Sequence, residues 1–421
     1  MQSRNRGVMT AFRLLRRMSI SLNARPLAGS GCRIVILAIS VAAGAFLGPY
    51  VRADEFDALN FALGSTVSYD SNVFRTPDST SPQPDTIYTG YVGLRFDKPY
   101  AQQRFQADIT ETATRYQTSS QLDFDGLTYR AAWLWHLTPR LNGTLSADHS
   151  ESSVSFADTT GTNRNIRTTE NRIFNLDGEL SARWHLLFGI SQADQTSEAP
   201  TQGVPDFHSN RVEAGVRYVT TSGNTLSFVQ RMIRGDYVNV VLDPNNPVND
   251  DFRGYNSEFQ ANWVLNAKSE LTGRLAWIDR RSDHFSQFDF SGPAGALDYV
   301  WTPVSKLTVD FGARRELLPW QELDASYRVD SVISFAPTWR ASNRITLRAH
   351  LEHTESDFRG GSAPNGSSRS DTANSMLVGV SWLPLRSLTL GASLQEERRS
   401  SSDALMEYDA TVATISAALL F

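Results

Sequence analysis

The chain alternates apolar and polar side chains with a period of two over most of its length after Asp57. In these segments Asp, Glu, Arg, Asn, Gln, Ser and Thr occupy the positions between the apolar ones. Successive side chains of an extended strand point to opposite faces, so the alternation predicts β-strands with one apolar and one polar face. No segment of comparable length shows a helical period. The clearest strands lie within Leu127–Leu137, Phe174–Trp184, Tyr255–Leu265, Leu271–Trp277, Ile345–Leu351 and Leu388–Leu394.

The connections between these strands are of two alternating kinds. Short turns follow an aromatic residue, as in Trp135–Leu141, Trp263–Leu271, Trp301–Leu307 and Trp382–Leu388, and Trp339 lies within another. The long connections are rich in polar residues, Gly and Pro, and we expect flexible loops there. One short and one long connection recur about every 40 residues. The long connections are residues 70–85, 118–125, 150–169, 194–210, 236–252, 280–293, 354–371 and 399–404.

This organisation predicts an all-β fold, a transmembrane antiparallel up-and-down β-barrel of about 18 strands with short periplasmic turns and long extracellular loops. Aromatic residues beside the short turns are typical of a belt at the membrane interface. A β-solenoid or a propeller also has repeats of this length. Neither explains why short and long connections alternate, and no Gly-His or Trp-Asp blade signature recurs.

Composition narrows the class of protein further. Hydrophobic residues make up 40% of the chain and the mean hydropathy is −0.33, so only the amino terminus has a long apolar run. A barrel wall needs no such run, because every second residue faces the lumen. The net charge of −5 gives no indication of a nucleic-acid partner.

The amino terminus has the features of a secretory signal peptide. The apolar run Ile34–Leu47 follows several arginines and precedes Val51-Arg52-Ala53, a small-residue pattern suited to cleavage after Ala53. We therefore predict a signal peptide over 1–53 and a mature barrel over 54–421. An uncleaved anchor is the alternative, but the run is shorter than the roughly 20 residues of a membrane span. The single cysteine, Cys32, lies before the cleavage point, so the mature chain would have no disulfide.

The last strand carries an apolar row that ends at the terminus itself: Ala413, Ile415, Ala417, Leu419 and Phe421. An ordinary edge or core strand would have the same pattern. The ending also resembles the carboxyl-terminal signature of bacterial outer-membrane β-barrels. That resemblance implies that Phe421 is an assembly signal read by the barrel-assembly machinery. It also implies export through the periplasm to the outer membrane of a Gram-negative bacterium, with membrane lipid as a partner.

The sequence offers few candidates for catalysis. His208-Ser209-Asn210 resembles the site of outer-membrane phospholipases only superficially, and a turn explains it equally well. His149-Ser150-Glu151 has no identifiable partner. Asp243, Asp250 and Asp251 supply oxygen ligands, but their spacing matches no calcium motif. We therefore predict no enzymatic activity, no cofactor and no metal site, and an outer-membrane hydrolase remains a minor alternative.

The polar faces of the strands predict a charged lumen. An arginine on the lipid face costs about 2–4 kcal/mol at the membrane midplane, so arginines that alternate with the apolar row should face inward. Acidic residues on neighbouring strands allow salt bridges across the wall, while paired guanidinium donors also suit a passage for anionic or hydroxyl-rich solutes. Both interpretations stay open. The candidate lumen-lining residues are Arg130, Arg183, Arg217, Arg231, Arg274, Arg314, Arg328 and Arg348.

The first strand and its exit loop carry Ser68-Tyr69-Asp70-Ser71-Asn72-Val73-Phe74-Arg75. This stretch resembles the amino-terminal motif of a family of outer-membrane β-barrel porins encoded in exopolysaccharide biosynthesis operons. The strand and turn pattern extends the resemblance over 55–421. It implies a channel or scaffold for exopolysaccharide export or assembly, with polysaccharide and periplasmic export components as partners. A general diffusion porin for small solutes is the alternative.

Overall fold

The computed structural model describes residues 58–157, 161–199, 206–238, 251–322, 325–360 and 369–421, and the predicted signal peptide lies outside them. These residues form one 18-stranded antiparallel sheet, and short 3₁₀ turns are the helical elements among them. The strands are β1 Leu59–Asp70, β2 Asp85–Tyr100, β3 Gln103–Tyr116, β4 Phe124–Thr138, β5 Leu141–Ser153, β6 Ile166–Glu179, β7 Trp184–Ser197, β8 Phe207–Val219, β9 Thr225–Tyr237, β10 Phe252–Asn266, β11 Ser269–Ser282, β12 Phe290–Val304, β13 Leu307–Glu322, β14 Ala325–Arg340, β15 Ile345–Gly360, β16 Ser370–Trp382, β17 Leu388–Ser401 and β18 Tyr408–Leu420.

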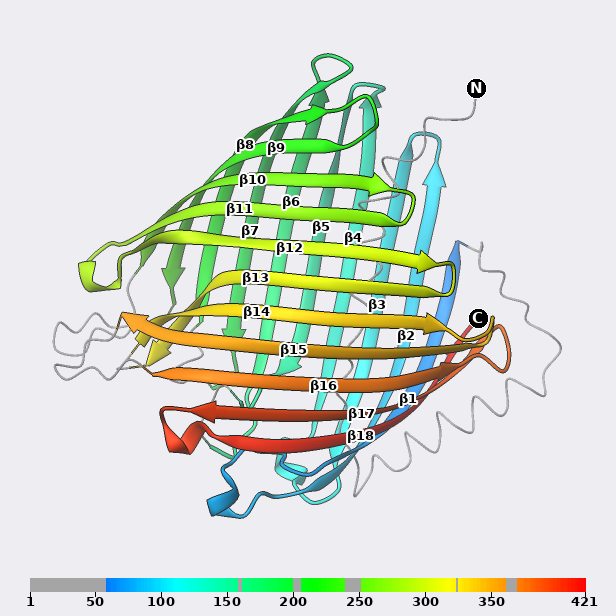
Figure 1. Ribbon diagram of the computed structural model, residues 1–421, viewed down its shortest axis with the longest axis vertical. Coiled ribbons are helices and arrows are strands. Elements are labelled where there is room, and N and C mark those ends of the chain that lie inside the picture. The colour runs from blue at the N-terminus through cyan, green and yellow to red at the C-terminus, as the bar shows by residue number, and fades with distance from the viewer. Residues whose placement is uncertain (1–57, 158–160, 200–205, 239–250, 323–324, 361–368) are drawn as a thin grey trace.

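The sheet closes on itself between its first and last strands. β1 pairs with both β2 and β18, so the blue and red ends of the chain are neighbours in Figure 1. At this seam the Phe421 amide donates to the Phe61 carbonyl over 2.9 Å, and the two rings stack with their centroids 6.2 Å apart. Closure leaves no strand edge exposed, which a sheet in lipid requires. The predicted fold class and strand number are confirmed.

The turns follow the predicted alternation with two differences. The segment Phe174–Trp184, predicted as one strand, is instead the end of β6, a turn at 180–183 and the start of β7. Its apolar alternation continues through the turn, which hid the turn in the sequence. The second difference is that β13 ends at Glu322 and β14 begins at Ala325, a connection that none of the predicted long loops includes.

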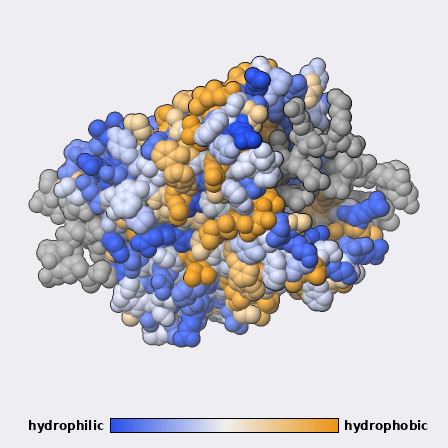
Figure 2. Space-filling model, turned by 45° about the horizontal axis from the view of Figure 1, so that its top comes forward, coloured by the Kyte–Doolittle hydropathy of each residue, from blue (hydrophilic) through white to orange (hydrophobic). Residues whose placement is uncertain are grey.

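The outer surface carries the apolar faces of the strands. Leu275, Ile415 and Phe259 are 74%, 69% and 60% exposed. An apolar surface of this extent is not typical of a water-soluble protein. In Figure 2 hydrophobic side chains gather over the middle of the visible face, with hydrophilic ones to both sides. Tryptophans mark the short-turn end of this apolar band, where Trp184, Trp301, Trp339 and Trp382 are 41–50% exposed. The strands have 12–16 residues, more than the roughly 9–11 that a membrane crossing needs.

Candidate functional site: the inner wall and the mouth of the barrel

The register of the strands separates outward from inward side chains. On β9, Leu226, Phe228 and Met232 belong to the apolar outer row, so Ser227 and Arg231 between them face the lumen. The register pairs the outer residues of β9 with outer residues of β8 and β10, so the same alternation separates outward from inward side chains on those strands. The inner wall is therefore the polar face of the predicted strands.

Charged side chains of alternating sign run across the inner wall from β8 to β13. Arg231 Nε lies 2.6 Å from Glu213, and its Nη1 lies 2.7 Å from Glu258. Arg274 lies 3.8 Å from Glu258 and 2.7 Å from Glu316. Glu258 is almost fully buried between two arginines, and these two contacts compensate its negative charge. We refer to Glu213, Arg231, Glu258, Arg274 and Glu316 as the charge ladder.

Other predicted arginines also meet acidic partners on the inner wall. Arg217 lies 2.5 Å from Asp177, which accepts a second contact of 2.7 Å from His185. Arg314 lies 3.3 Å from Glu352. These contacts agree with the salt-bridging interpretation, in which the wall neutralises its own charge.

Three of the remaining arginines occupy separate levels of the wall. Arg328 lies 2.9 Å from Asp330 near the long-loop end. Arg348 donates to Ser381 over 2.9 Å. Arg130 stands opposite Asp108 on β3 and Asp148 on β5 in the sheet register.

Arg183 is not on a strand, and its predicted place on the lumen wall is wrong. It lies in the exposed turn between β6 and β7, and its guanidinium is 3.4 Å from the Tyr218 hydroxyl. The apolar alternation that runs through the turn gave Arg183 an apparent strand position. For the other seven arginines, a role in a passage stays a prediction.

The wall near the seam is different. Around the middle of these strands its inner face consists mainly of small neutral side chains: Thr66 and Ser68 on β1, Ser375 and Gly379 on β16, Ser393 on β17, and Thr414 and Ser416 on β18. The hydroxyls of Ser68 and Thr414 are 2.9 Å apart. The charge ladder thus occupies one side of the barrel, and short neutral side chains occupy the other.

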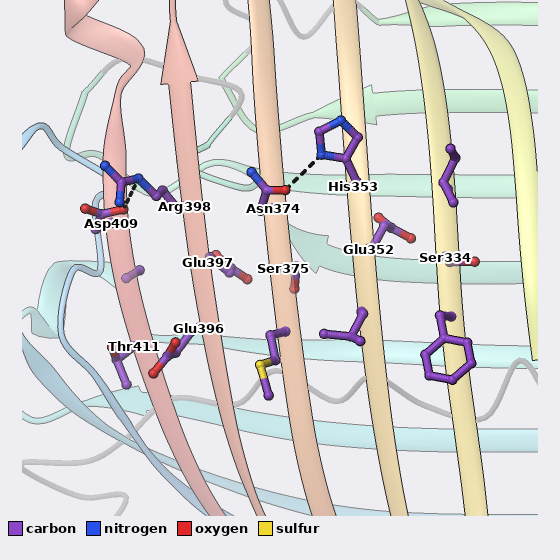
Figure 3. A pocket seen from close by; sticks show the side chains of 15 residues that line it. Ser334, Glu352, His353, Asn374, Ser375, Glu396, Glu397, Arg398, Asp409 and Thr411 are labelled. Atoms are coloured by element: carbon purple, nitrogen blue, oxygen red, sulfur yellow. Dashed lines mark hydrogen bonds and ion pairs between the residues drawn. The ribbon is translucent and has the colours of Figure 1, made fainter.

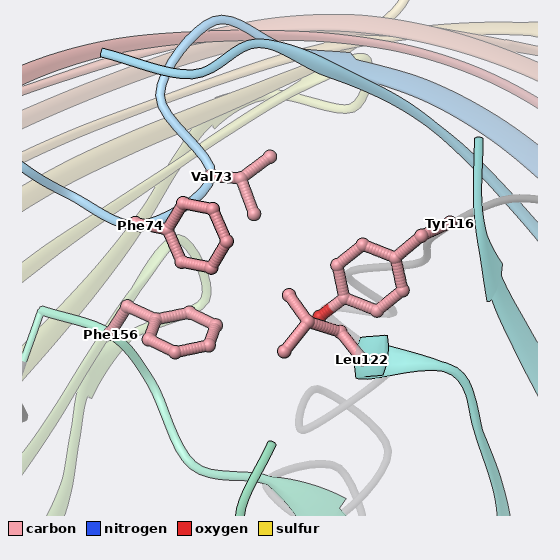
Figure 4. Close-up of a cluster of buried hydrophobic side chains, with 5 residues drawn as sticks. All are labelled: Val73, Phe74, Tyr116, Leu122 and Phe156. Carbon is pink, nitrogen blue, oxygen red and sulfur yellow. The ribbon is translucent and has the colours of Figure 1, made fainter. Parts of the chain in front are cut away.

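The extracellular mouth contains a buried apolar cluster built from connections between strands (Figure 4). Phe74 follows β1, Leu122 lies in the turn after β3, and Phe156 follows β5, where the Phe74 and Phe156 rings meet edge to face at 5.1 Å. Val73 and Tyr116 complete the cluster, in which every member is at most 8% exposed. Residues 154–157 are therefore packed in place rather than a flexible loop, and the expectation for this part of 150–169 is wrong.

The segment that follows β5 extends across the inside of the barrel. The Arg399 guanidinium on β17 donates to the backbone carbonyl of Ala157. In the sheet order, β18, β1, β2, β3 and β4 separate β17 from β5. Arg399 alternates with the outward Arg398 and Leu394, so it faces inward. A residue just after β5 reaches this side chain only by extending over the part of the mouth that these strands enclose.

Buried ion pairs hold the crossing in place. Asp371 lies 2.8 Å from Arg369 and also contacts Arg399, and all three side chains are at most 7% exposed. Arg75, in the loop after β1, lies 2.9 Å from Asp70 and 3.0 Å from Glu397. We call these residues, together with the apolar cluster and Ala157, the mouth cluster.

The charge of Arg75 is secured by its partners. Burial by itself lowers the pKa of the Arg75 guanidinium, but Asp70 and Glu397 outweigh burial and raise that pKa above its usual value. Arg75 therefore stays charged and ties the loop after β1 to β1 and β17. Sequence reasoning missed the mouth cluster. Two local signals were present: the apolar pair Val154 and Phe156 inside a polar loop, and Val73-Phe74-Arg75 in the motif after the first strand.

The candidate catalytic pairs are not assembled. His208 and Ser209 are adjacent on β8, so they point to opposite faces; His208 contacts Asp194 on the outer surface. His149 likewise faces outward and stacks on Tyr129 at 4.8 Å, whereas Ser150 faces inward. Among the described residues no cluster of three or more His, Cys, Asp or Glu could hold a metal ion. Asp243 and Asp250, two of the three carboxylates considered as calcium ligands, lie outside the described residues.

The outer wall also carries polar residues, beyond the extracellular edge of its apolar band. On β15–β18 these include His353, Asn374, Glu396, Arg398 and Asp409, around a shallow hollow of about 550 Å³. Figure 3 shows the contacts from His353 to Asn374 and from Arg398 to Asp409, which are 2.8 and 3.6 Å long. The strands thus continue past the membrane on this side. None of the helices in the described ranges is long and apolar enough to span a membrane.

Comparisons with known proteins support the fold. No family model matches the chain, and no curated protein matches its sequence. The solved structures it resembles include OccK2 (OpdF) of Pseudomonas aeruginosa, with a TM-score of 0.50, 10% identity, and coverage of 86% of this chain and 97% of that one. OpdK of the same organism, crystallised with vanillate, has a TM-score of 0.47 and 11% identity, with coverage of 86% of this chain and 99% of that chain.

A third solved structure is the alcaligin receptor FauA of Bordetella pertussis. It has a TM-score of 0.44 and 12% identity, with coverage of 88% of this chain and 77% of that chain. Identities this low bear on the fold alone. The apolar outer surface and the closed sheet together require a lipid environment. The protein is an outer-membrane β-barrel, as its sequence predicted.

Proposed function

We propose that this barrel is a diffusion channel for small hydrophilic solutes, with an opening limited by the segment after β5. The contact between Arg399 and the Ala157 carbonyl carries the proposal, because it places that segment across the mouth. A polar, charged inner wall is what a water-filled passage needs. OccK2 of Pseudomonas aeruginosa, a protein of similar length, has the same fold.

The crossing segment also weighs on the exopolysaccharide interpretation. A polymer chain would have to pass a mouth in which loops from β1, β3 and β5 pack together. The comparisons give no support to an exopolysaccharide association. That role, with its periplasmic partners, remains a second proposal, which rests on the resemblance carried by Ser68–Arg75 and by the strand and turn pattern of 55–421.

Conductance separates these functions. We expect the refolded protein in planar bilayers to give steady ion-conducting steps, and liposomes that contain it to swell in small sugars but not in long oligosaccharides. Arg399→Ala should raise the size limit, because the segment loses its anchor on β17. Passage of long anionic oligosaccharide through the wild type would favour polysaccharide export. A barrel that conducts no ions would contradict the diffusion channel.

Assembly is a separate proposal. Phe421 pairs with Phe61 at the seam, so its side chain and its backbone help to close the barrel. We propose that the same strand is the part of the chain that the assembly machinery recognises. Removal of Phe421 should lower the yield of folded barrel in the outer membrane, measured by the mobility of unheated samples on gels. Normal yield would contradict this role.

A further inference from the structure

Three arginines stand side by side on the outer face of the barrel. In the sheet register Arg253 on β10 is directly opposite both Arg234 on β9 and Arg281 on β11. All three alternate with outward residues such as Met232 and Tyr255, so they face away from the lumen. Like charges directly opposite one another destabilise a sheet. Three in a row therefore concentrate guanidinium groups on one part of the outer surface.

The row continues on three further strands with residues that have N–H donors, and none of these residues is acidic. Next to Arg234 the same register position is Asn210 on β8, then Gln192 on β7 and Arg172 on β6. We call these six residues of β6–β11 the donor row. Its members are all N–H donors, and some of these donors also contact acidic neighbours: Arg172 lies 2.7 Å from Glu170, and Gln192 donates to Asp194 over 3.2 Å.

The residues on either side of the donor row are sorted by type. Towards the membrane, Met232 and Tyr255 come next on β9 and β10, and they are 58% and 48% exposed. Away from the membrane, Glu170, Asp194 and Asp236 come next on β6, β7 and β9. The wall thus presents apolar, cationic and anionic side chains in that order from the lipid outwards. On β11 the boundary is shifted, with Asp279 between Arg281 and Trp277.

Nearby carboxylates do not enclose these arginines. Arg234 lies 3.0 Å from Asp236, Arg253 lies 3.2 Å from Asp283, and Arg281 lies 3.2 Å from Asp279. The arginine side chains are 58%, 58% and 70% exposed, whereas their partners are 22–36% exposed. The guanidinium groups therefore extend beyond the carboxylates, and exposed pairs of this kind are weak enough to yield to a stronger anion.

We propose that the donor row binds the phosphate groups of a phosphorylated lipid in the outer leaflet of the membrane. Guanidinium groups bind phosphate oxygens through paired, charge-assisted hydrogen bonds. The row lies at the extracellular edge of the apolar band, where headgroups meet water, and Met232, Tyr255 and Trp277 below it offer contact to acyl chains. The site is on the outside of the wall, so it does not depend on whether the lumen conducts.

The test compares the refolded full-length mature protein with the triple variant R234Q/R253Q/R281Q. Binding of diphosphorylated lipid A, of its dephosphorylated form and of inorganic phosphate is measured in detergent by native mass spectrometry. Arg398→Gln serves as the matched control, because Arg398 is an outward arginine, 74% exposed, on β17. Gel mobility of unheated samples verifies that each variant is folded.

We expect the wild type and Arg398→Gln to bind diphosphorylated lipid A equally. The triple variant should bind it more weakly by about fivefold for each arginine removed. The dephosphorylated lipid should bind equally weakly to the wild type and to the triple variant. Unchanged binding by the folded triple variant would overturn the proposal. So would equal binding of the dephosphorylated lipid, or displacement of the lipid by equimolar inorganic phosphate.

Discussion

The charge ladder and the mouth cluster both use arginine and carboxylate pairs, in different surroundings. At one end of the ladder, Arg274 is 43% and Glu316 is 35% exposed, so lumen water reaches both, and Glu258 is the buried exception at 3%. In the mouth cluster, Arg369 and Asp371 are 4% and 3% exposed. A solvated pair contributes little to stability, whereas breaking a buried pair strands a charge. The ladder therefore sets the charge of the wall, and the mouth cluster holds a segment in position.

The largest effect should follow from Asp371→Asn. This change removes the charge that Arg369 and Arg399 share, and it leaves two buried guanidinium groups without their anion. Loss of one partner of a buried ion pair costs about 3–5 kcal/mol. We expect the mouth to loosen, seen as faster proteolysis within residues 154–157 and 161–165 of the folded barrel. Protection equal to that of the wild type would show that the two regions do not differ in this way.

Phe156→Ala tests the apolar part of the mouth cluster. The ring packs against Phe74, and removal of a buried phenylalanine side chain costs about 3 kcal/mol or more. Because the barrel wall does not depend on this contact, the cost should appear as local opening at the mouth with little change in the unfolding midpoint in urea. Leu405→Ala, at an outer connection where the side chain is 67% exposed, is the matched control. A large fall in the midpoint would mean that the loops and the wall unfold together.

Glu258→Gln gives the ladder its strongest test, since Glu258 is the member whose side chain is 3% exposed. We expect a loss of stability of about 1–3 kcal/mol, because Arg231 keeps Glu213 as a second partner. The loss of unfolding free energy that Glu258→Gln causes is measured in urea. It should be smaller than the loss in the free energy of local opening that Asp371→Asn causes at the mouth. The opposite order would invert the comparison between the ladder and the mouth.

Glu352→Gln should have the smallest effect. Glu352 and Arg314 are 27% and 44% exposed, and a solvated pair contributes about 0–1 kcal/mol. The expected change is in permeation rather than stability: loss of one negative charge beside Arg314 in the lumen should shift ion selectivity slightly towards anions. Reversal potentials in a salt gradient measure the shift. Selectivity identical to that of the wild type would mean that this part of the wall is away from the ion path.

The sequence was informative about the wall because alternation is a local property. Each apolar row, such as Tyr255, Phe259 and Trp263, fixes the face of its own strand and thereby of the arginines between its members. The mouth cluster depends on contacts between residues far apart in the chain, such as Arg399 and Ala157, which no local pattern encodes. Arg183 shows where alternation fails as a guide to the face of a side chain. The apolar alternation continues through the turn between β6 and β7, so Arg183 has the pattern of a strand residue without being on a strand.

The donor row illustrates the same limit on the outer surface. Arg234, Arg253 and Arg281 are each unremarkable in sequence, and only the register of β9, β10 and β11 brings them together. Alternation assigns a side chain to a face of its own strand, whereas the neighbour across the sheet depends on where each turn begins.

The crossing of the mouth by the segment after β5 can be measured as a distance. Spin labels at Ala157→Cys and Ser400→Cys suit this purpose, and cleavage after Ala53 would leave no native cysteine to interfere. A pair at Ser400→Cys and Asp409→Cys on neighbouring strands β17 and β18 supplies the short reference distance. Because the label at 400 points outward whereas Ala157 contacts the inward Arg399, we predict a distance from 157 to 400 that exceeds this reference by no more than the thickness of the wall. A distance comparable to the width of the barrel would place the segment outside the mouth and contradict the account.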